Sequence, residues 1–379
     1  MGRTKKALLV TTVSGFVPQF EMNNVRLLQE RGYEVHYASN FDMPSYGDNN
    51  DRLKGTGIRC HQIAFAREPW NLQNMSAVRE LAALIRREGV SLLHCHTPMG
   101  AACARVAAAR TGLRNVIYTA HGFHFFDGAP KKNWLIYYPV EKFLSRYTDS
   151  LLLINREDYA RARKKFSARH TDLLPGVGID IEAVQRGSAE SAGLREELGI
   201  SPDKRVLLTA GEMIPRKNQA LLLEVLRRLN NPSLTLVILG HGKLRDELQA
   251  RAKALGVEQQ VLFPGYRTDV FRFYGMADLF LFPSLQEGLP VAVMEAMAAG
   301  LPVVASGVRG NRDLILPGKG GELLSPHRAT DWEKVVSILL GDCKKREAYG
   351  LYNRQRIGAF SREANETKMR EIYARYDEA

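Results

Sequence analysis

The chain has 379 residues, a formal net charge of +12 at pH 7 and an isoelectric point near 9.5. Its composition, 45% hydrophobic and 25% charged, excludes a disordered or fibrous chain. The length exceeds what one hydrophobic core usually organises, so we expect two domains.

The positive charge is concentrated in the first half of the chain. Residues 1–180 carry 25 Lys and Arg against 16 Asp and Glu, a net charge of +9. An excess of this sign favours anionic partners, which include phosphate-bearing ligands, nucleic acid and an acidic membrane surface. The four cysteines have no paired spacing, and this pattern favours a reducing compartment over a disulfide framework.

The amino terminus has basic residues before an apolar segment, as a signal peptide does, but it lacks a small-residue cleavage site. No apolar run approaches the roughly 20 residues that span a bilayer. We therefore expect a cytoplasmic protein, at most peripheral at the inner face of the membrane.

Apolar runs alternate with helical patterns along the chain. The first series predicts strands at 7–12, 33–39, 91–96, 115–120 and 150–155, with a helix near 20–31. The second series predicts strands at 205–210, 233–240, 260–265, 278–283 and 301–306, with helices from about 218, 243 and 290.

This alternation is typical of βαβ units. It predicts an α/β fold with two doubly wound, Rossmann-like domains, at 1–180 and 181–360, and a closing helix at 361–379. The cleft between two such domains is the default ligand site.

The stretch QEGLPVAVMEAMAAG places Glu287 just before a predicted helix and Glu295 within it, among apolar neighbours. A buried carboxylate needs donors. An internal arginine or backbone N–H groups could supply them, and so could the adjacent hydroxyls of a ribose. The loop Gly288–Pro290 lets a ligand approach the helix N-terminus, where free N–H groups suit phosphate. This arrangement is typical of a nucleotide site.

Arg216 and Lys217 follow the 205–210 strand and open the next helix, where positive charges oppose the helix dipole. We interpret the pair as the cations that neutralise a diphosphate. The alternative is that both are solvated surface residues.

His121 ends another strand, in TAHGFHFF, at the edge of the sheet where open α/β folds bind ligands. Gly15 lies between the first strand and its helix, in a loop with too few glycines for a dinucleotide fingerprint. His94, Cys95 and His96 are adjacent in a predicted strand and point to alternate faces, so they cannot all bind one metal ion.

Together, the Glu287–Glu295 spacing, AHGFHFF, the Gly-x-x-x-Pro-Arg-Lys turn and PGVGID resemble family 4 of the retaining glycosyltransferases, which have the GT-B fold. The similarity covers nearly the whole chain. It is greatest to bacterial enzymes of capsule, exopolysaccharide and lipid-linked glycan assembly. The resemblance implies a UDP-sugar as the donor, and the sugar that is transferred could be an N-acetylhexosamine. It also implies a glycan or lipid-linked acceptor held by the first domain.

The resemblance also implies roles for individual residues. Glu295 would hold the ribose hydroxyls, and Glu287 and His121 the donor sugar. Lys217 would neutralise the diphosphate, and Gly15 would leave room for the phosphates. The loop Gly288, Leu289 and Pro290 would place the N–H groups that follow it, from Val291 onward, against the diphosphate. This chain has Glu212 where the family often has an arginine, and Arg216 is the residue that could replace that charge.

Similar enzymes retain the anomeric configuration without a protein nucleophile or a bound metal, so we expect no cofactor or metal.

The segment 131–143 mixes cations with Trp and Tyr, as a surface on anionic lipid would. The alternative is that this segment is a helix packed within its own domain.

The rival functions for the whole protein are another GT-B chemistry, such as a UDP-sugar 2-epimerase, and a basic nucleic-acid-binding protein. The chain lacks a nucleic-acid motif, so we expect no such partner.

Overall fold

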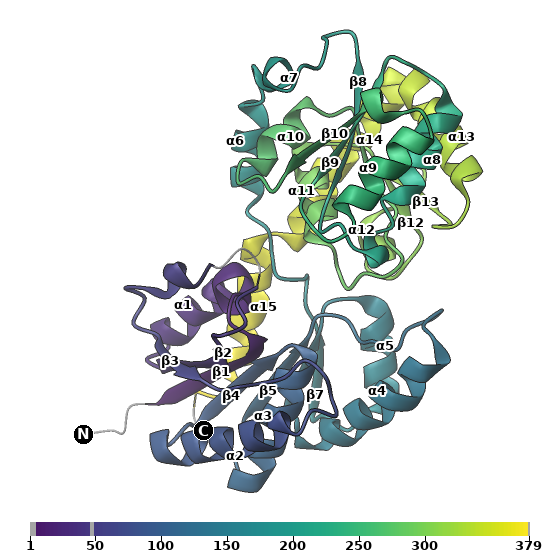
Figure 1. Cartoon of the computed structure of the whole chain (residues 1–379). Coiled ribbons are helices and arrows are strands. Elements are labelled where there is room, and N and C mark those ends of the chain that lie inside the picture. Colours follow the sequence, from purple (N-terminus) through teal and green to yellow (C-terminus); the bar gives the residue numbers. More distant parts are fainter. Residues whose placement is uncertain (1–4, 46–48, 378–379) are drawn as a thin grey trace. The chain divides into compact units, whose positions relative to one another are not determined.

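The computed structural model describes residues 5–45 and 49–377. The chain forms two compact units, each described by itself (Figure 1). The first unit comprises residues 1–178 and 363–379, and the second comprises residues 179–362. Each contains a sheet whose described strands are all parallel. The predicted α/β fold with two Rossmann-like domains is confirmed.

The first sheet has the strand order β3-β2-β1-β4-β5-β6-β7. Its strands are β1 Lys6–Val13, β2 Glu34–Asn40, β3 Arg59–Gln62, β4 Leu92–His96, β5 Val116–Ala120, β6 Ser150–Leu153 and β7 His170–Leu173. The central strands are buried on both sides, which explains their nearly continuous apolar runs. The strand order reverses between β1 and β4, and ligands of open α/β sheets bind outside the carboxyl ends at such a point.

Helices cover both faces of the first sheet. They are α1 Met22–Glu30, α2 Gln73–Glu88, α3 Pro98–Thr111, α4 Lys131–Leu144, α5 Arg156–Lys165 and α15 Arg362–Ala374, with short turns η1 Val17–Glu21, η2 Asn49–Leu53 and η3 Ser145–Tyr147. Figure 1 shows α2 and α3 together on one face, and these helices share a core with alternate residues of the central strands. The helix predicted near 20–31 begins earlier, because a π-helical turn from Val17 leads into α1.

The last helix, α15, belongs to the first unit, although it follows the second unit in sequence. Tyr373 contacts His94 of β4 through a hydrogen bond of 2.9 Å between its hydroxyl and Nδ1. Tyr376, just beyond the helix, makes a 2.6 Å hydrogen bond to the Ser150 hydroxyl of β6. Met369 and Ile372 are fully buried. The helix therefore completes the face of the sheet opposite α2 and α3.

The second sheet has the order β10-β9-β8-β11-β12-β13, which reverses between β8 and β11. Its strands are β8 Arg205–Ala210, β9 Leu234–Leu239, β10 Val261–Gly265, β11 Leu279–Phe282, β12 Val303–Ser306 and β13 Gly321–Leu324. Its helices are α6 Ile181–Ala189, α7 Leu194–Glu197, α8 Ala220–Leu229, α9 Arg245–Ala254, α10 Val270–Met276, α11 Val291–Ala299, α12 Asn311–Leu314, α13 Ala329–Gly341 and α14 Cys343–Arg356, with short turns η4 Pro215–Lys217, η5 Glu258–Gln260 and η6 Ile357–Phe360. Helices α8, α9 and α13 share one apolar core with the strands.

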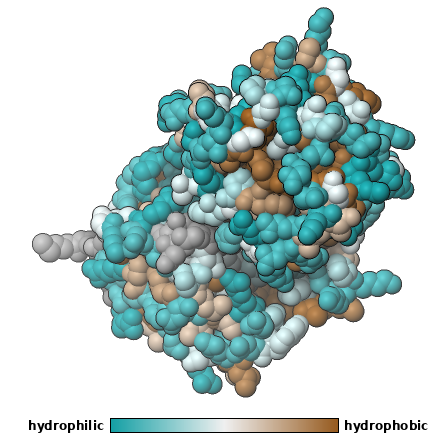
Figure 2. Space-filling view, turned by 45° about the horizontal axis from the view of Figure 1, so that its top comes forward, coloured by the Kyte–Doolittle hydropathy of each residue, from teal (hydrophilic) through white to brown (hydrophobic). Residues whose placement is uncertain are grey.

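The surface is mostly hydrophilic on the face drawn in Figure 2, and patches of hydrophobic residues interrupt it. Within residues 5–45 and 49–377, no helix has both the length and the apolar character needed to cross a bilayer.

Candidate active site

The residues predicted to bind a nucleotide lie at the point where the second sheet reverses its strand order. Lys217 is in the loop that follows β8, and Glu287 is in the loop that follows β11. The Leu285 N–H donates to the Arg216 carbonyl over 2.8 Å, which ties the two loops together. The expected edge of the sheet therefore carries both the cations and the acid.

Two cations share one carboxylate at this edge. Glu287 Oε1 lies 2.7 Å from Lys217 Nζ and 3.1 Å from Arg216 Nη1. Arg216 also donates to the Gln286 carbonyl over 2.8 Å. Burial lowers the pKa of Lys217, and the nearby Glu287 carboxylate offsets part of that shift. The two cations, Arg216 and Lys217, outnumber the one carboxylate, Glu287. The three side chains together therefore keep a net positive charge, which suits an anionic ligand.

The Glu287 loop is held by a neighbouring loop that the sequence analysis missed. Arg309 is 2% exposed and donates from Nε to the Glu287 carbonyl over 3.0 Å. Gly310 has φ +77°, and a Cβ atom there would lie 2.4 Å from the Gly288 carbonyl oxygen. The sequence signal was available, since GVRGN follows directly after β12 at the same edge.

Helix α11 begins directly after the loop Gly288–Pro290. Pro290 is the N-cap, Val291 is the first helical residue, and Leu289 is 8% exposed. The first N–H groups of any helix lack partners within the helix and carry partial positive charge. The helix ends at Gly300, whose φ of +84° forms a left-handed cap. Helix α11 therefore begins at the loop where a phosphate is expected, and binding of a phosphate there stays a prediction.

Among the residues that the structure describes, Glu295 has no arginine partner. In the described part of the chain its side-chain partner is Tyr274 of α10, whose hydroxyl donates to Oε2 over 2.9 Å. Burial raises the pKa of Glu295 to about 7, and the Tyr274 hydrogen bond partly opposes this shift. One donor does not satisfy two carboxylate oxygens. Glu295 therefore retains acceptor capacity for a ligand hydroxyl.

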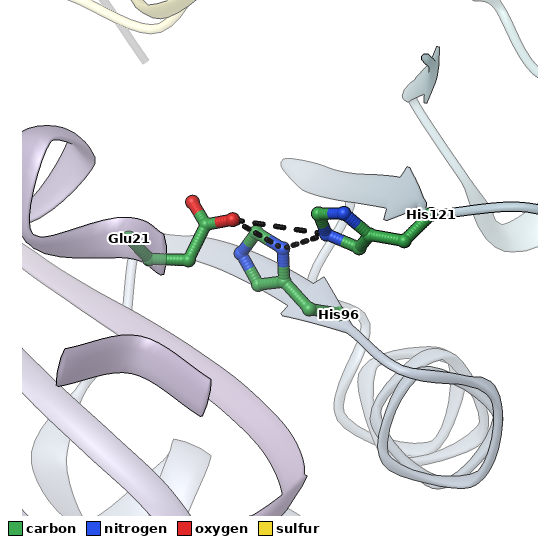
Figure 3. Close-up of side chains that lie close together, drawn as sticks. All are labelled: Glu21, His96 and His121. Carbon is green, nitrogen blue, oxygen red and sulfur yellow. Dashed lines mark hydrogen bonds and ion pairs between the residues drawn. The ribbon is translucent and has the colours of Figure 1, made fainter. Parts of the chain in front are cut away.

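The first unit gathers a second group of polar residues at its own reversal point, drawn in Figure 3. His121, which follows β5, lies near His96 at the end of β4 and near Glu21 of η1. His96 Nδ1 is 3.2 Å from His121 Nε2 and 3.4 Å from Glu21 Oε1. His121 Nε2 is 3.7 Å from Glu21 Oε1. The sequence pattern pointed to His121 alone, and the fold adds Glu21 and His96 as its neighbours.

Burial controls the charges in this group. It raises the pKa of Glu21 to about 8, against a hydrogen bond from Asn24 that lowers it. It lowers the pKa of His121 to about 4, and that of His96 well below its usual value. His96 Nε2 is buried without a hydrogen-bond partner among the described residues. All three side chains are therefore mostly uncharged at neutral pH.

The adjacent residues His94 and Cys95 do not join this group. His94 donates or accepts through both ring nitrogens, to Tyr373 and to the Thr119 hydroxyl at 2.8 Å. Cys95 points to the other face of the sheet, toward the core shared with α2 and α3. The expectation that these neighbours cannot share one ion with His96 agrees with this geometry.

Gly15 follows β1 at the same edge. A Cβ atom there would lie 1.7 Å from the Ser45 carbonyl oxygen, so the close approach of the chain to itself already requires glycine. Room for a phosphate beside Gly15 stays a prediction.

Two Rossmann-like units, each with polar groups at its reversal point, are typical of the GT-B fold, and comparisons with known proteins give the class of enzyme. A model of the glycosyl transferase 4-like family matches residues 5–155, and one of glycosyl transferases group 1 matches residues 191–356. EpsD of Bacillus subtilis strain 168, named as a glycosyltransferase, is 35% identical over 380 residues, covering 98% of this chain and 97% of EpsD. The chain therefore belongs to these glycosyltransferase families, and the predicted membership is confirmed.

Two further similarities concern ligands of other proteins. The UDP-Gal:alpha-D-GlcNAc-diphosphoundecaprenol alpha-1,3-galactosyltransferase of Escherichia coli is 26% identical over 366 residues, or 90% of this chain and 91% of that enzyme. HepE of Anabaena, crystallised with UDP and glucose, matches with a TM-score of 0.81 at 19% identity, over 98% of this chain and 100% of HepE. At that identity the likeness shows the fold.

Proposed function

We propose that the chain moves a sugar from a UDP-linked donor to a lipid-linked saccharide, with retention of the anomeric configuration, in cell-surface polysaccharide assembly. The observation that carries the donor assignment is the group of Lys217, Arg216 and Glu287, which shares an edge of the second sheet with the partly satisfied Glu295. The diphosphoundecaprenol-linked sugar in the name of the E. coli galactosyltransferase supports a lipid-linked acceptor. The resemblance to bacterial capsule and exopolysaccharide enzymes supports the cell-surface pathway.

The proposed roles follow the chemistry of each group. Glu295 accepts hydrogen bonds from the ribose hydroxyls, and the N–H groups from Val291 onward meet the diphosphate. Lys217 and Arg216 neutralise the diphosphate as it departs, while Glu287 positions both cations and binds the donor sugar. His121 is assigned to the sugar and Gly15 to the phosphates.

In the proposed step, the acceptor oxygen bonds to the anomeric carbon as the bond from that carbon to the diphosphate breaks. The acceptor proton passes to the departing diphosphate on the same face of the sugar. The charge that develops on the diphosphate is met by Lys217 and Arg216, so we propose that this step requires no metal ion.

Thermal unfolding with a panel of sugar nucleotides tests the donor site. A UDP-sugar at about 100 times its Kd should stabilise the protein by roughly 2.7 kcal/mol, whereas GDP- and ADP-sugars should shift the transition less. Glu295→Ala should abolish the shift, and Lys217→Ala should reduce it. The matched control is Glu322→Ala, because Glu322 also accepts from a tyrosine, Tyr349, over 2.7 Å in the same unit.

Product analysis tests the reaction. With an undecaprenyl-diphosphate saccharide as acceptor, we expect release of UDP and an anomeric coupling constant that matches the donor. Conversion of the UDP-sugar to an epimer without acceptor would contradict transfer.

We also infer that the first unit rests on an anionic lipid surface. An apolar groove of about 630 Å³ is lined by the start of α2, by α3 along its length and by the end of α4. Its lining includes the exposed side chains Trp70, Leu72 and Phe143. Arg79 and Arg110 line the same groove. Apolar side chains flanked by cations match the layers of an anionic membrane surface, with acyl chains below and charged headgroups above.

A further inference from the structure

The first unit contains two sets of two histidines and one glutamate, which differ in one geometric respect. In one set, Glu34 and His61 contact opposite ring nitrogens of His36, at 3.0 Å and 2.9 Å. Their ligand atoms therefore cannot meet at one point. In the other set, Glu21 Oε1 and His121 Nε2 both face the same nitrogen of His96, Nδ1.

The three facing atoms form a nearly equilateral triangle, with sides of 3.2, 3.4 and 3.7 Å. Zinc ligands at about 2.0–2.2 Å in a tetrahedron lie roughly 3.3–3.6 Å apart. The 3.7 Å side is too long for a hydrogen bond, so hydrogen bonding does not account for all three approaches. One shared cation does account for them.

The three side chains are also held in place by the fold. His96 and His121 follow adjacent strands, β4 and β5, which are paired in register, and Glu21 ends η1. Asn24 donates to the other Glu21 oxygen, and His94 packs on His96 with a ring-centroid distance of 4.2 Å. Within the described chain, no other three His, Cys, Asp or Glu side chains bring ligand atoms within 4.8 Å of one another.

We propose that Glu21, His96 and His121 bind a divalent transition-metal ion of the zinc class. Two imidazoles and one carboxylate form the ligand set of zinc sites that leave their fourth position to water or a substrate oxygen. His121 is the member open to solvent, with 21% of its side chain exposed, against 3% for Glu21 and 0% for His96.

The proposal goes beyond the transfer reaction. The ion is not needed for departure of the diphosphate, which the cations of the second unit serve. Its effect in the first unit is on His121, because a metal at Nε2 places the ring proton on Nδ1. The ion would thereby fix which nitrogen of His121 can donate a hydrogen bond to a sugar.

Titration of the metal-stripped full chain with Co²⁺, in the absence of any sugar nucleotide, tests the site. We expect one Co²⁺ per chain, a visible absorption band of tetrahedral cobalt, and loss of that band when Zn²⁺ is added. Glu21→Gln and His121→Asn should each weaken Co²⁺ binding at least 10–100-fold, roughly the loss known for outer-shell partners.

The matched control is His61→Asn, which alters the other histidine pair and should leave the cobalt band unchanged. Thermal unfolding of each variant without metal separates loss of a ligand from loss of the fold, and Glu21→Gln keeps the side-chain shape. Absence of the band in the folded wild-type chain, or an equal band in Glu21→Gln, would overturn the proposal. Neither result concerns the proposed nucleotide-binding residues of the second unit, which the thermal-shift panel tests separately.

Discussion

Glu295 is an acid whose protonation must change before it can serve as proposed. Burial raises its pKa to about 7, so the free protein holds a proton on this group over much of the range below pH 7. A carboxylate is the stronger acceptor for two ribose hydroxyls. Binding of the ribose therefore favours the deprotonated form and lowers the pKa of Glu295 in the complex.

The sign of the resulting pH dependence follows directly. Above pH 7 the free protein already has the carboxylate, so affinity for a UDP-sugar should be flat. Below pH 7 a proton must leave on binding, and affinity should fall by up to about tenfold per pH unit. Calorimetric titration with a UDP-sugar, whose diphosphate diester does not titrate in this range, measures both affinity and proton release.

The control for this prediction is Glu295→Gln, which keeps the shape and removes the titration. Its affinity should be roughly tenfold lower at pH 8, because neutral hydrogen bonds replace charged ones, and should not vary between pH 6 and 8. A wild-type affinity that is equally flat would show that Glu295 is not the group that titrates on binding.

At the scale of single elements, helix α4 bears the proposed membrane contact. Leu135 is 77% exposed, and Lys131, Lys132 and Lys142 are exposed on the same helix. Other residues of α4 do pack internally: Arg105 of α3 pairs with the buried Glu141 at 2.8 Å. The alternative of internal packing therefore holds for one face of α4, and the proposed lipid contact concerns the other face.

Leu72→Asp and Phe143→Asp should each reduce sedimentation with anionic vesicles at low salt. Loss of one inserted apolar side chain costs about 1.5–3 kcal/mol, which corresponds to roughly tenfold or more in binding. The control is Ile338→Asp, an equally drastic change at an exposed apolar residue of α13 in the second unit. Equal sedimentation with neutral and anionic vesicles would contradict the charge-based part of the inference.

Elements differ in how well the sequence predicts them. The predicted strands correspond to central strands and to the edge strand β10, all of which contain short apolar runs. The missed strands β3, β7 and β13 lie at sheet edges. An edge strand is covered less completely, so RCHQ and HTDL have no apolar run to detect.

The residues of the candidate site also differ in how well the sequence predicts them. Glu287, Glu295, Lys217 and His121 could be selected as candidates because each stands in a strand–loop–helix context that restricts its role. Tyr274 and Glu21 were not selected, because each reaches its partner from a separate helical element. Such contacts depend on packing between elements, and a linear pattern does not encode them.

At the scale of the whole molecule, the chain leaves the first unit near residue 178 and returns to it near residue 363. The return brings buried apolar side chains, Met369 and Ile372, onto the first sheet. It also supplies Tyr373, whose hydrogen bond to His94 holds that ring against His96. The last helix thus packs against the histidine group and contributes no metal ligand to it.

A chain shortened to residues 1–362 should therefore lose the cooperative unfolding of its first unit. Two buried apolar side chains contribute roughly 3–6 kcal/mol and two hydrogen bonds about 1 kcal/mol each, which together approach the 5–15 kcal/mol stability of a typical domain. Urea unfolding followed by circular dichroism should show one retained transition, from the second unit, and a broad or missing transition from the first unit.

The control Arg370→Ala removes a surface ion pair to Glu30 and should cost less than about 1 kcal/mol of stability. Two intact transitions in the shortened chain would mean that the first sheet is stable with that face uncovered, and that α15 is not needed to hold His94.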